Sequence, residues 1–219
     1  PAEGAHVQTA LVVLISYLLG SIPTSNIAAR LRGVDLRRVG SGNPGFTNVL
    51  RTMGARVAAP VLIVDIAKGV AAVLFVAGTL GDGSSLRQTG IGLAAGLAAV
   101  AGHIWPVFAR FRGGKGVATA CGVFAAMAPL ATLAAVVLWL AIVIPTRYVS
   151  LGSIAAALFL PWAIWIEGGI LETGRPTALM LTAGLVAVAV VLRHLGNIKR
   201  LLNGTENRFG RTPKQEGER

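Results

Sequence analysis

Long apolar runs alternate with short polar segments along the whole of this chain. The clearest runs are Val7–Ala29, Ala55–Leu80, Thr89–Ala109, Ser150–Ile166 and Thr177–Leu192. Each run is apolar all round a helix, whereas a helix of a soluble protein keeps a polar face. Since about 20 apolar helical residues cross a bilayer, we expect each run to form a membrane span.

The stretch from Gly116 to Pro145 is harder to assign. It is about ten residues too long for a single span, and Pro129 stands in its middle. A proline inside a helix removes a hydrogen bond and kinks or breaks the helix. Two short helices hinged at Pro129 and one long kinked helix both fit this pattern.

The basic residues favour the two-helix interpretation. Most of the 20 Lys and Arg residues lie in four segments: Arg30–Arg56, Arg110–Lys115, the position of Arg147, and Arg193–Arg219. Basic loops face the cytoplasm, and these four segments share one side only if two crossings separate Lys115 from Arg147. We therefore expect an all-α polytopic membrane protein of about seven short helices, with the N-terminus outside and the C-terminus cytoplasmic.

Composition supports a membrane protein and argues against a soluble domain. Hydrophobic residues make up 54% of the chain, charged residues 13%, and the mean hydropathy is +0.69. The net charge of +11 lies beside the spans, where it meets anionic headgroups rather than nucleic acid. No basic region precedes the first run, so we expect no cleavable signal. We expect one transmembrane domain over residues 1–219, with a flexible tail at 211–219.

The first polar segment with candidate chemistry is VGSGNPGFTNVLR, from Val39 to Arg51. Glycines let backbone N–H groups converge on one point, and the helix that follows adds positive potential at its N-terminus. The segment is a candidate anion cradle. A glycine-rich turn with Asn and Thr as helix caps explains it equally well.

The second candidate is GHIWPVFARFRGGKGVAT, from Gly102 to Thr119. Its glycines and Lys115 offer backbone amides and an ammonium group to a phosphate. The segment is not a Walker A loop, because Ala109 and Gly116 stand where that motif needs glycine and Ser or Thr. The simpler alternative is a lysine that snorkels from a helix end.

Two further segments place polar side chains in pairs at helical spacing. Ser150 and Ser153 share one helix face, as do His194 and Asn197 at the end of the last span. Serine caps and an interfacial histidine anchor are the simpler interpretations. Glu206 is surrounded by basic residues, so we expect it to be a structural ion-pair partner.

Polar residues also occur inside the spans. Asp65 and Lys68 are three residues apart, and each would cost about 2.5–3.5 kcal/mol unpaired at mid-membrane. We expect them to pair inside the bundle and to hold the helix rather than react. The run GSIPTSNIAAR gathers Ser21, Thr24 and Asn26 around Pro23, so these side chains should line an interior pocket.

Several expected chemistries lack their residues in this sequence. There is no Cys/His cluster for a metal, and the single Cys121 cannot form an internal disulfide. No acid stands five residues after His103, where Phe108 is found, as it would in acyltransferases that use acyl-CoA or acyl carrier protein. A face rich in cations and poor in carboxylates suits two phosphorylated substrates.

Five segments together resemble one known family. GSIPTSNI, GSGNPGFTNVLR, GHIWPVFARFRGGKGVAT, RYVSLGSI and NIKRLLNGTENR are similar, in this order, to signature segments of bacterial acyl-phosphate-dependent glycerol-3-phosphate acyltransferases. The resemblance implies transfer of a fatty acyl group from acyl phosphate to the 1-hydroxyl of glycerol 3-phosphate in the bacterial inner membrane. The products would be lysophosphatidic acid and phosphate. It implies no cofactor, no metal, and no need for CoA or acyl carrier protein.

The resemblance also suggests roles for individual residues. The phosphate of the acyl donor is assigned to Ser41, Gly42, Asn43, Thr47 and Asn48. Glycerol 3-phosphate and the developing charge are assigned to Arg51, Lys115, His194 and Asn197, beside the glycines Gly113, Gly114 and Gly116. Ser153 would position one substrate. Since no residue is an obvious general base, the donor's own phosphate would take the hydroxyl proton.

The chain departs from the family pattern at three positions, and two rival classes stay open. Phe46, Gly152 and Leu195 stand where the family usually has alanine, serine and arginine. A small transporter of organic anions also fits intramembrane charges and broken helices, although no repeat is visible and the specific residues gather on one face. A purely structural membrane protein explains the spans but not the glycine-rich segments.

Overall fold

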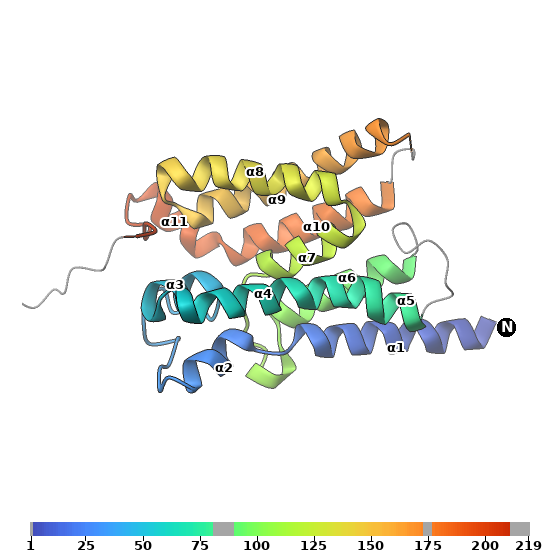
Figure 1. Cartoon of the computed structure of the whole chain (residues 1–219), viewed down its shortest axis with the longest axis horizontal. Helices are drawn as coiled ribbons and strands as arrows, with labels where there is room; N and C mark the ends of the chain where they lie inside the picture. Colours follow the sequence, from blue (N-terminus) through green and yellow to red (C-terminus); the bar gives the residue numbers. More distant parts are fainter. Residues whose placement is uncertain (1, 81–89, 173–176, 211–219) are drawn as a thin grey trace, which may run out of the picture.

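The computed structural model describes residues 2–80, 90–172 and 177–210, and the regular structure within these ranges is entirely helical. The long helices lie roughly along one axis (Figure 1). The elements in chain order are α1 (Ala2–Gly20), α2 (Thr24–Arg30), α3 (Phe46–Met53), α4 (Ala55–Ala71), η1 (Ala72–Val76), α5 (Ala77–Leu80), α6 (Gly90–Ile104), η2 (Val107–Ala109), α7 (Val117–Met127), α8 (Pro129–Thr146), α9 (Val149–Ile170), α10 (Thr177–Arg193) and α11 (Leu195–Leu202). The predicted tail, 211–219, lies outside the described residues.

Small residues let the helices pack closely. A Cβ on Gly20 of α1 would lie 2.1 Å from the carbonyl oxygen of Ala99 in α6. A Cβ on Gly122 of α7 would lie 2.0 Å from the carbonyl oxygen of Ile66 in α4. These helix pairs are therefore in backbone contact, as is common where small residues line membrane helices.

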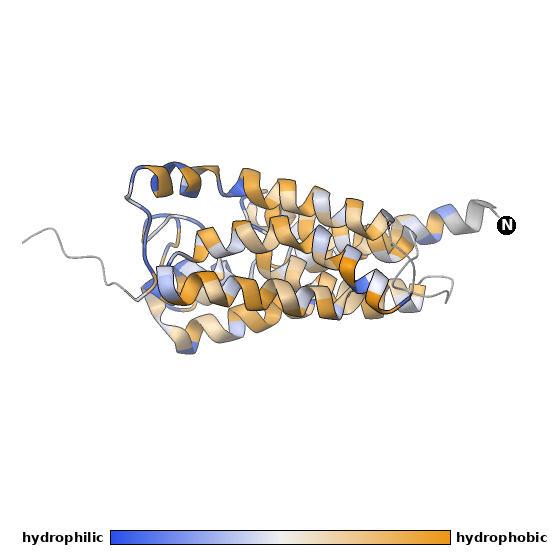
Figure 2. Ribbon diagram, turned by 90° about the horizontal axis from the view of Figure 1, so that it is seen from above, coloured by the Kyte–Doolittle hydropathy of each residue, from blue (hydrophilic) through white to orange (hydrophobic). Residues whose placement is uncertain are grey.

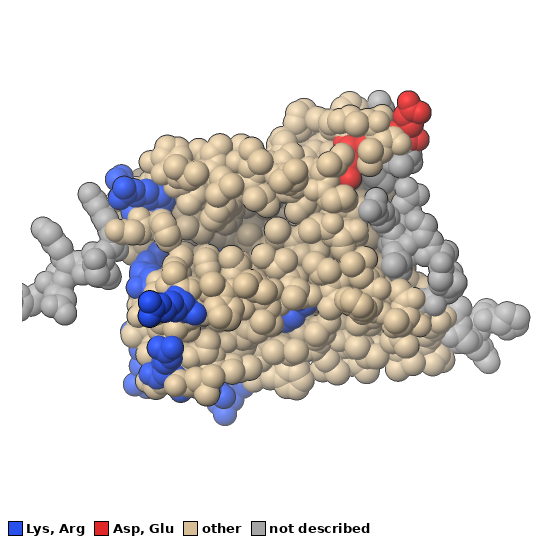
Figure 3. Space-filling model, in the orientation of Figure 1, with Lys and Arg blue, Asp and Glu red and all other residues tan. Residues whose placement is uncertain are grey.

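Charge separates the two ends of the bundle. Hydrophobic residues cover the middle of the molecule, and hydrophilic residues gather at the end that holds α3 and α11 (Figure 2). Lys and Arg residues crowd that end, which we call the basic end, while acidic residues are visible at the opposite end (Figure 3). The start of α1 and α11 lie at opposite ends (Figure 1), as the basic segments of the sequence predict.

The predicted division of the Gly116–Pro145 stretch is confirmed. α7 ends at Met127 and α8 begins at Pro129. Proline is tolerated there because the first turn of a helix has no hydrogen-bond partner for its N–H groups. The chain therefore forms two helices, not one kinked helix. The second span is also as predicted, since α4, η1 and α5 run without a break from Ala55 to Leu80.

The first span, predicted over Val7–Ala29, is confirmed as a candidate crossing over His6–Arg30, but it is not one continuous helix. α1 ends at Gly20 and α2 begins at Thr24, with a non-helical break around Pro23. Proline lacks an N–H and clashes with the carbonyl one turn earlier, so the carbonyl groups before it need other donors. The side chain of Lys68 supplies them, as described below.

The number of membrane crossings stays a prediction. Within the described ranges, five helical segments are long and apolar enough to cross, and there are six if α10 and α11, bent by 58° at their junction, form one span. α7 has 11 residues, which is short of the roughly 20 that span a bilayer. The described part of the chain is thus all-helical, with five or six candidate membrane spans.

Candidate active site

A cavity of about 320 Å³ brings together most of the predicted site residues. It is bounded by α3, α4, α7, α8, α9 and α10 and reaches the loops at the basic end. Its polar end is lined by Ser41, Asn43, Thr47, Asn48, Arg51, Lys115, Gly116, Ser150, Ser153, His194, Asn197 and Glu206. The rest of its wall is mostly apolar and lies deeper between the helices, with Asp65, His103 and Thr132 as polar exceptions. Of the predicted site residues, Gly42, Gly113 and Gly114 do not border it.

Asn48 shapes the first glycine-rich segment. Its side-chain oxygen accepts a hydrogen bond from the N–H of Ser41 at 2.9 Å, and its NH₂ group donates to the carbonyls of Leu36 and Val39, both at 3.1 Å. Gly40, at φ +60°, lies against this amide, where a Cβ would be 2.1 Å from its oxygen. The Asn48 amide is thus occupied by the loop, and it positions Ser41 instead of reaching outward.

The start of α3 is open toward the cavity. α3 begins at Phe46, and its N-cap, Gly45, provides no side-chain hydrogen bond. The N–H groups of a first helical turn lack internal partners and favour an anion. Thr47 of this turn, together with Ser41 and Asn43, borders the cavity. An anion cradle at this helix start stays a prediction.

Lys115 is linked to the C-terminal segment through a chain of hydrogen bonds. Its ammonium donates to the side-chain oxygen of Asn197, and Asn197 donates to Glu206 at 2.6 Å. Glu206 also accepts from Ser150 at 3.0 Å and from Arg200 at 2.7 Å. The predicted ion-pair role of Glu206 is confirmed, and Ser150, assigned only as a helix cap, proves to be part of the same network.

The protonation states of this network follow from burial. Burial lowers the pKa of Lys115 to about 8, an effect that Glu206 opposes and the nearby arginines reinforce. Burial also lowers the pKa of Arg51, although a guanidinium stays charged at neutral pH. Two cations therefore face the polar end, and a bound phosphate would favour the charged form of Lys115.

His194 is a neutral hydrogen-bonding group and not a third cation. Burial lowers its pKa to about 4, and the charge of Lys115 contributes. Its Nδ1 lies 2.8 Å from the carbonyl oxygen of Val190. Because a carbonyl can only accept, Nδ1 carries the proton, which leaves Nε2 as an acceptor. His194 can therefore accept a hydrogen bond from a substrate hydroxyl.

Gly113 and Gly114 are packed against His103 on the other side of the loop. A Cβ on Gly113 would lie 2.1 Å from the carbonyl oxygen of His103, and one on Gly114 would lie 2.3 Å from its Nε2. Both glycines border a second cavity of only about 20 Å³. They are needed for close packing beside Lys115, and direct contact with a phosphate stays a prediction.

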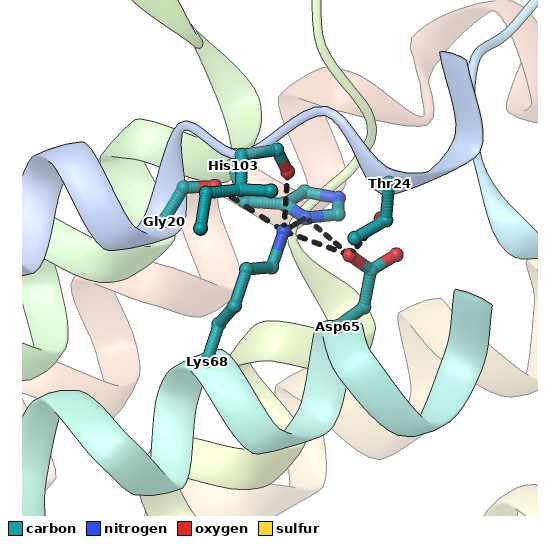
Figure 4. Close-up of polar contacts among 6 residues, drawn as sticks. Gly20, Thr24, Asp65, Lys68 and His103 are labelled. Carbon is teal, nitrogen blue, oxygen red and sulfur yellow. Dashed lines mark hydrogen bonds and ion pairs between the residues drawn. The ribbon is translucent and has the colours of Figure 1, made fainter. Parts of the chain in front are cut away.

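A second polar cluster lies inside the bundle, between α1, α2, α4 and α6 (Figure 4). Lys68 pairs with Asp65 at 2.7 Å, and both are buried, as predicted. Lys68 also donates to the carbonyls of Gly20 and Ile22, at 3.2 and 3.0 Å, and Thr24 donates to Asp65 at 2.5 Å. His103 completes the cluster, with Nδ1 3.4 Å from the Lys68 ammonium. The Asp–Lys pair thus anchors the break between α1 and α2.

The sequence did not reveal the partners of this cluster. The spacing of Asp65 and Lys68 predicted their pairing, but no local pattern connects them to His103. Thr24 was expected to line a pocket, and it does border the small second cavity. Ser21, expected beside it, is buried with its hydroxyl unpaired in the described structure.

The three departures from the family pattern have different surroundings. Phe46 opens α3 and borders the cavity. A Cβ on Gly152 would lie 2.5 Å from Val143 and 3.1 Å from Trp139, so a serine there requires Val143 to move. Leu195 is 55% exposed and does not border the cavity.

Comparisons with known proteins agree on one family. A family model described as glycerol-3-phosphate acyltransferase matches residues 10–204. A protein of that name from Chlorobaculum tepidum is 41% identical, and the match covers 91% of this chain and 97% of the relative. A protein of the same name from Geotalea daltonii is 46% identical, and the match covers 93% of this chain and 100% of the relative.

Solved structures agree with these relatives. A crystal structure of PlsY (YgiH), described as an integral membrane glycerol 3-phosphate acyltransferase in its glycerol 3-phosphate form, superposes with a TM-score of 0.83 at 40% identity. It covers 92% of this chain and 96% of that one. The lysophosphatidic acid form of PlsY gives a TM-score of 0.80 at 38% identity.

Proposed function

Since the chain belongs to the glycerol-3-phosphate acyltransferase family, it is a membrane enzyme that acylates glycerol 3-phosphate to lysophosphatidic acid, and we propose that its acyl donor is an acyl phosphate. The observation that carries the donor proposal is that one cavity, of about 320 Å³, has a polar end with Arg51 and Lys115 and a deeper wall that is mostly apolar. A phosphate headgroup fits the first part and a fatty acyl chain fits the second.

No described histidine at the polar end pairs with a carboxylate, and this supports the proposed donor. His103 and Asp65 also border the cavity, with Nδ1 3.7 Å from the carboxylate, but that carboxylate is already bound by Lys68 and Thr24. A thioester is a less activated donor, and enzymes that use one recruit a His–Asp pair to deprotonate the acceptor. His194 has a backbone carbonyl as its Nδ1 partner, and Glu206 is held by Arg200, Asn197 and Ser150. Neither arrangement makes a strong base. Phosphate leaves readily and can accept the proton itself.

The proposed reaction is one direct transfer. The cavity holds the acceptor hydroxyl within about 3–3.5 Å of the acyl carbonyl carbon. The hydroxyl oxygen forms the new ester bond, the bond between the carbonyl carbon and the phosphate oxygen breaks, and the hydroxyl proton passes to the departing phosphate. Lys115 and Arg51 stabilise the negative charge that develops, and Nε2 of His194 orients the hydroxyl.

We assign the two phosphates to the two sides of the polar end. The first turn of α3 and the loop before it, with Ser41, Asn43 and Thr47, receive the donor phosphate, and Asn48 holds that loop in shape. Gly42 lies in the same loop but does not border the cavity. Lys115, Asn197 and Arg51 receive glycerol 3-phosphate. Ser153 borders the cavity, where its hydroxyl accepts from the indole N–H of Trp139 at 3.3 Å and donates to the carbonyl of Val149 at 2.8 Å. We assign it to positioning one of the two substrates.

We place the basic end in the cytoplasm of a bacterial inner membrane, because basic loops stay on the cytoplasmic side. Cysteines introduced at Glu172, after α9, and at Asn203, after α11, should then be labelled from opposite sides of sealed cells. Labelling of both from one side would contradict this orientation.

Turnover of the purified protein tests the donor. It should form lysophosphatidic acid from glycerol 3-phosphate and palmitoyl phosphate without nucleotide, metal or acyl carrier protein, and chelators should have no effect. Palmitoyl-CoA at the same concentration should give little product. Comparable turnover with the CoA thioester would overturn the proposed donor.

A further inference from the structure

The apolar part of the cavity has a defined end, and nothing in the proposed chemistry explains where it lies. Phe124 of α7, Leu160 of α9 and Ala183 of α10 border the cavity. One helical turn farther along the same helices, Met127, Ile164 and Leu179 do not border it. These three are almost completely buried and pack into one apolar core. We call this packed layer the floor.

The floor lies at the break between α7 and α8, and a buried carboxylate stabilises that break. The N-cap of α8 is Ala128, whose side chain cannot accept a hydrogen bond. The N–H of Ala131, in the first turn, instead donates to Glu167 of α9 at 2.8 Å. Such a carboxylate satisfies an open N–H and interacts favourably with the positive end of the helix dipole. Glu167 is buried and has no role in the acyl transfer.

The depth of the floor matches the length of one lipid chain. Ser150, at the polar end, and Leu160, the last residue of α9 that borders the cavity before the floor, are ten residues apart on α9. At about 1.5 Å per residue this is about 15 Å. The hydrocarbon core of a bilayer is about 30 Å thick, so the acyl chains of one leaflet fill about the same depth.

Resting on the proposed acyl-phosphate donor, we propose that the floor measures the acyl chain and sets the upper limit of the chain length that the enzyme transfers. Leu160 is the residue that a chain of membrane-lipid length reaches at its end. Glu167 is a positioning residue, because it holds α8 against α9 at the level where the chain must stop. A longer chain leaves methylene groups outside the cavity or displaces the packed layer.

Variants of the cavity wall, as purified full-length protein in detergent, test whether the floor limits the acyl-chain length. The donors are lauroyl, myristoyl, palmitoyl, stearoyl and arachidoyl phosphate at saturating glycerol 3-phosphate, and kcat/KM is measured for each. Wild type should peak and then fall with the longest chains. Leu160→Ala should raise the ratio of arachidoyl to palmitoyl phosphate at least fourfold, since each buried methylene changes binding about fourfold.

A larger side chain in the cavity wall should shift the chain-length preference toward shorter acyl chains. Ala157 borders the cavity and is only half-buried, so Ala157→Leu should cut kcat/KM for palmitoyl phosphate at least fourfold and spare lauroyl phosphate. Leu158→Ala is the matched control. Leu158 is 60% exposed on the outer face of the same helix, and its loss should leave the length profile unchanged.

Variants of Glu167 distinguish an effect on chain-length preference from a general loss of stability. Glu167→Ala should broaden the length profile while KM for glycerol 3-phosphate stays within twofold, and Glu167→Gln, which keeps an acceptor oxygen, should restore the profile. The proposal that the floor limits chain length is wrong if Leu160→Ala and Ala157→Leu change the dependence of kcat/KM on chain length no more than Leu158→Ala does. If wild type makes no lysophosphatidic acid from any acyl phosphate, the donor proposal fails instead.

Discussion

Two polar clusters in this protein contain the same kinds of residue but use them differently. The cluster between α1, α4 and α6 holds Lys68, Asp65 and His103 (Figure 4). The polar end of the cavity also holds a lysine, a carboxylate and a histidine: Lys115, Glu206 and His194. Proximity to the cavity does not separate them, because Asp65 and His103 border it too.

The difference lies in the hydrogen-bonding capacity that each lysine leaves unused. An ammonium has three donors. Lys68 has an acceptor for each of them, in Gly20, Ile22 and Asp65. Lys115 has one acceptor among the described residues, in Asn197, and borders the cavity. A saturated lysine holds the fold, whereas an unsaturated lysine beside a cavity is available to a substrate.

Loss of the Lys115 charge should have the largest effect on activity. Lys115→Met should lower kcat/KM for glycerol 3-phosphate by about 10²–10³-fold, the range for removing one group that stabilises transition-state charge. The unfolding temperature should hardly change. Lys199→Met, at an exposed lysine of α11, is the control and should keep near wild-type activity. Near wild-type activity in Lys115→Met would reduce Lys115 to a snorkelling residue.

Breaking the other cluster should cost stability instead. Asp65→Ala leaves Lys68 charged and unpaired in the bundle, which should destabilise the protein by about 3–5 kcal/mol. Replacing both charges, in Asp65→Leu with Lys68→Met, should recover much of this loss, because buried pairs are often replaceable by apolar residues. Reaction of the single free Cys121 with a thiol dye reports unfolding. Equal stability of the single and double variants would contradict the assigned role.

The alkaline limb of the pH profile should come from Lys115. Burial lowers its pKa to about 8, so the free enzyme loses this charge as pH rises through about 8, and kcat/KM for glycerol 3-phosphate should fall there. Lys115→Arg should remove this limb, because a guanidinium stays charged. An unchanged limb in Lys115→Arg would assign it to another group. His194, with a pKa of about 4, should stay neutral across this range.

The smallest effect is expected at Trp139. Its indole N–H lies 3.3 Å from the hydroxyl of Ser153, and Trp139→Phe keeps the aromatic bulk. A hydrogen bond of this kind contributes about 0.5–1.5 kcal/mol, so kcat/KM for the acyl donor should fall less than about tenfold. A loss as large as that of Lys115→Met would place Trp139 in the charge-stabilising machinery.

Most of the fold could be predicted from the sequence because a bilayer constrains helices strongly. The apolar run of Ala55–Leu80 and the proline at position 129 gave the helices that the structure contains. The break before Thr24 was missed, because a proline kink and a true break have the same local signal. The break depends on Lys68, which lies far along the chain and supplies donors to the exposed carbonyls.

The site was predicted as a set of residues but not as a network. Glycine-rich segments and i,i+3 pairs identified Lys115, His194 and Asn197, all of which border the cavity. The sequence could not show that Asn48 is occupied by its own loop. It also could not show that Ser150 and Asn197 share Glu206, because such long-range hydrogen bonds leave no periodic pattern.

Binding of glycerol 3-phosphate to two folded variants tests the distinction between the clusters most directly. The variants are Lys115→Met and the double variant Asp65→Leu with Lys68→Met, compared with wild type by calorimetry in the same detergent. Loss of a charge-assisted contact of about 1.5–3 kcal/mol should weaken binding by Lys115→Met about 10–150-fold. The double variant should bind within about twofold of wild type, because its cluster has no donor to spare. Weaker binding by the double variant than by Lys115→Met would contradict the account.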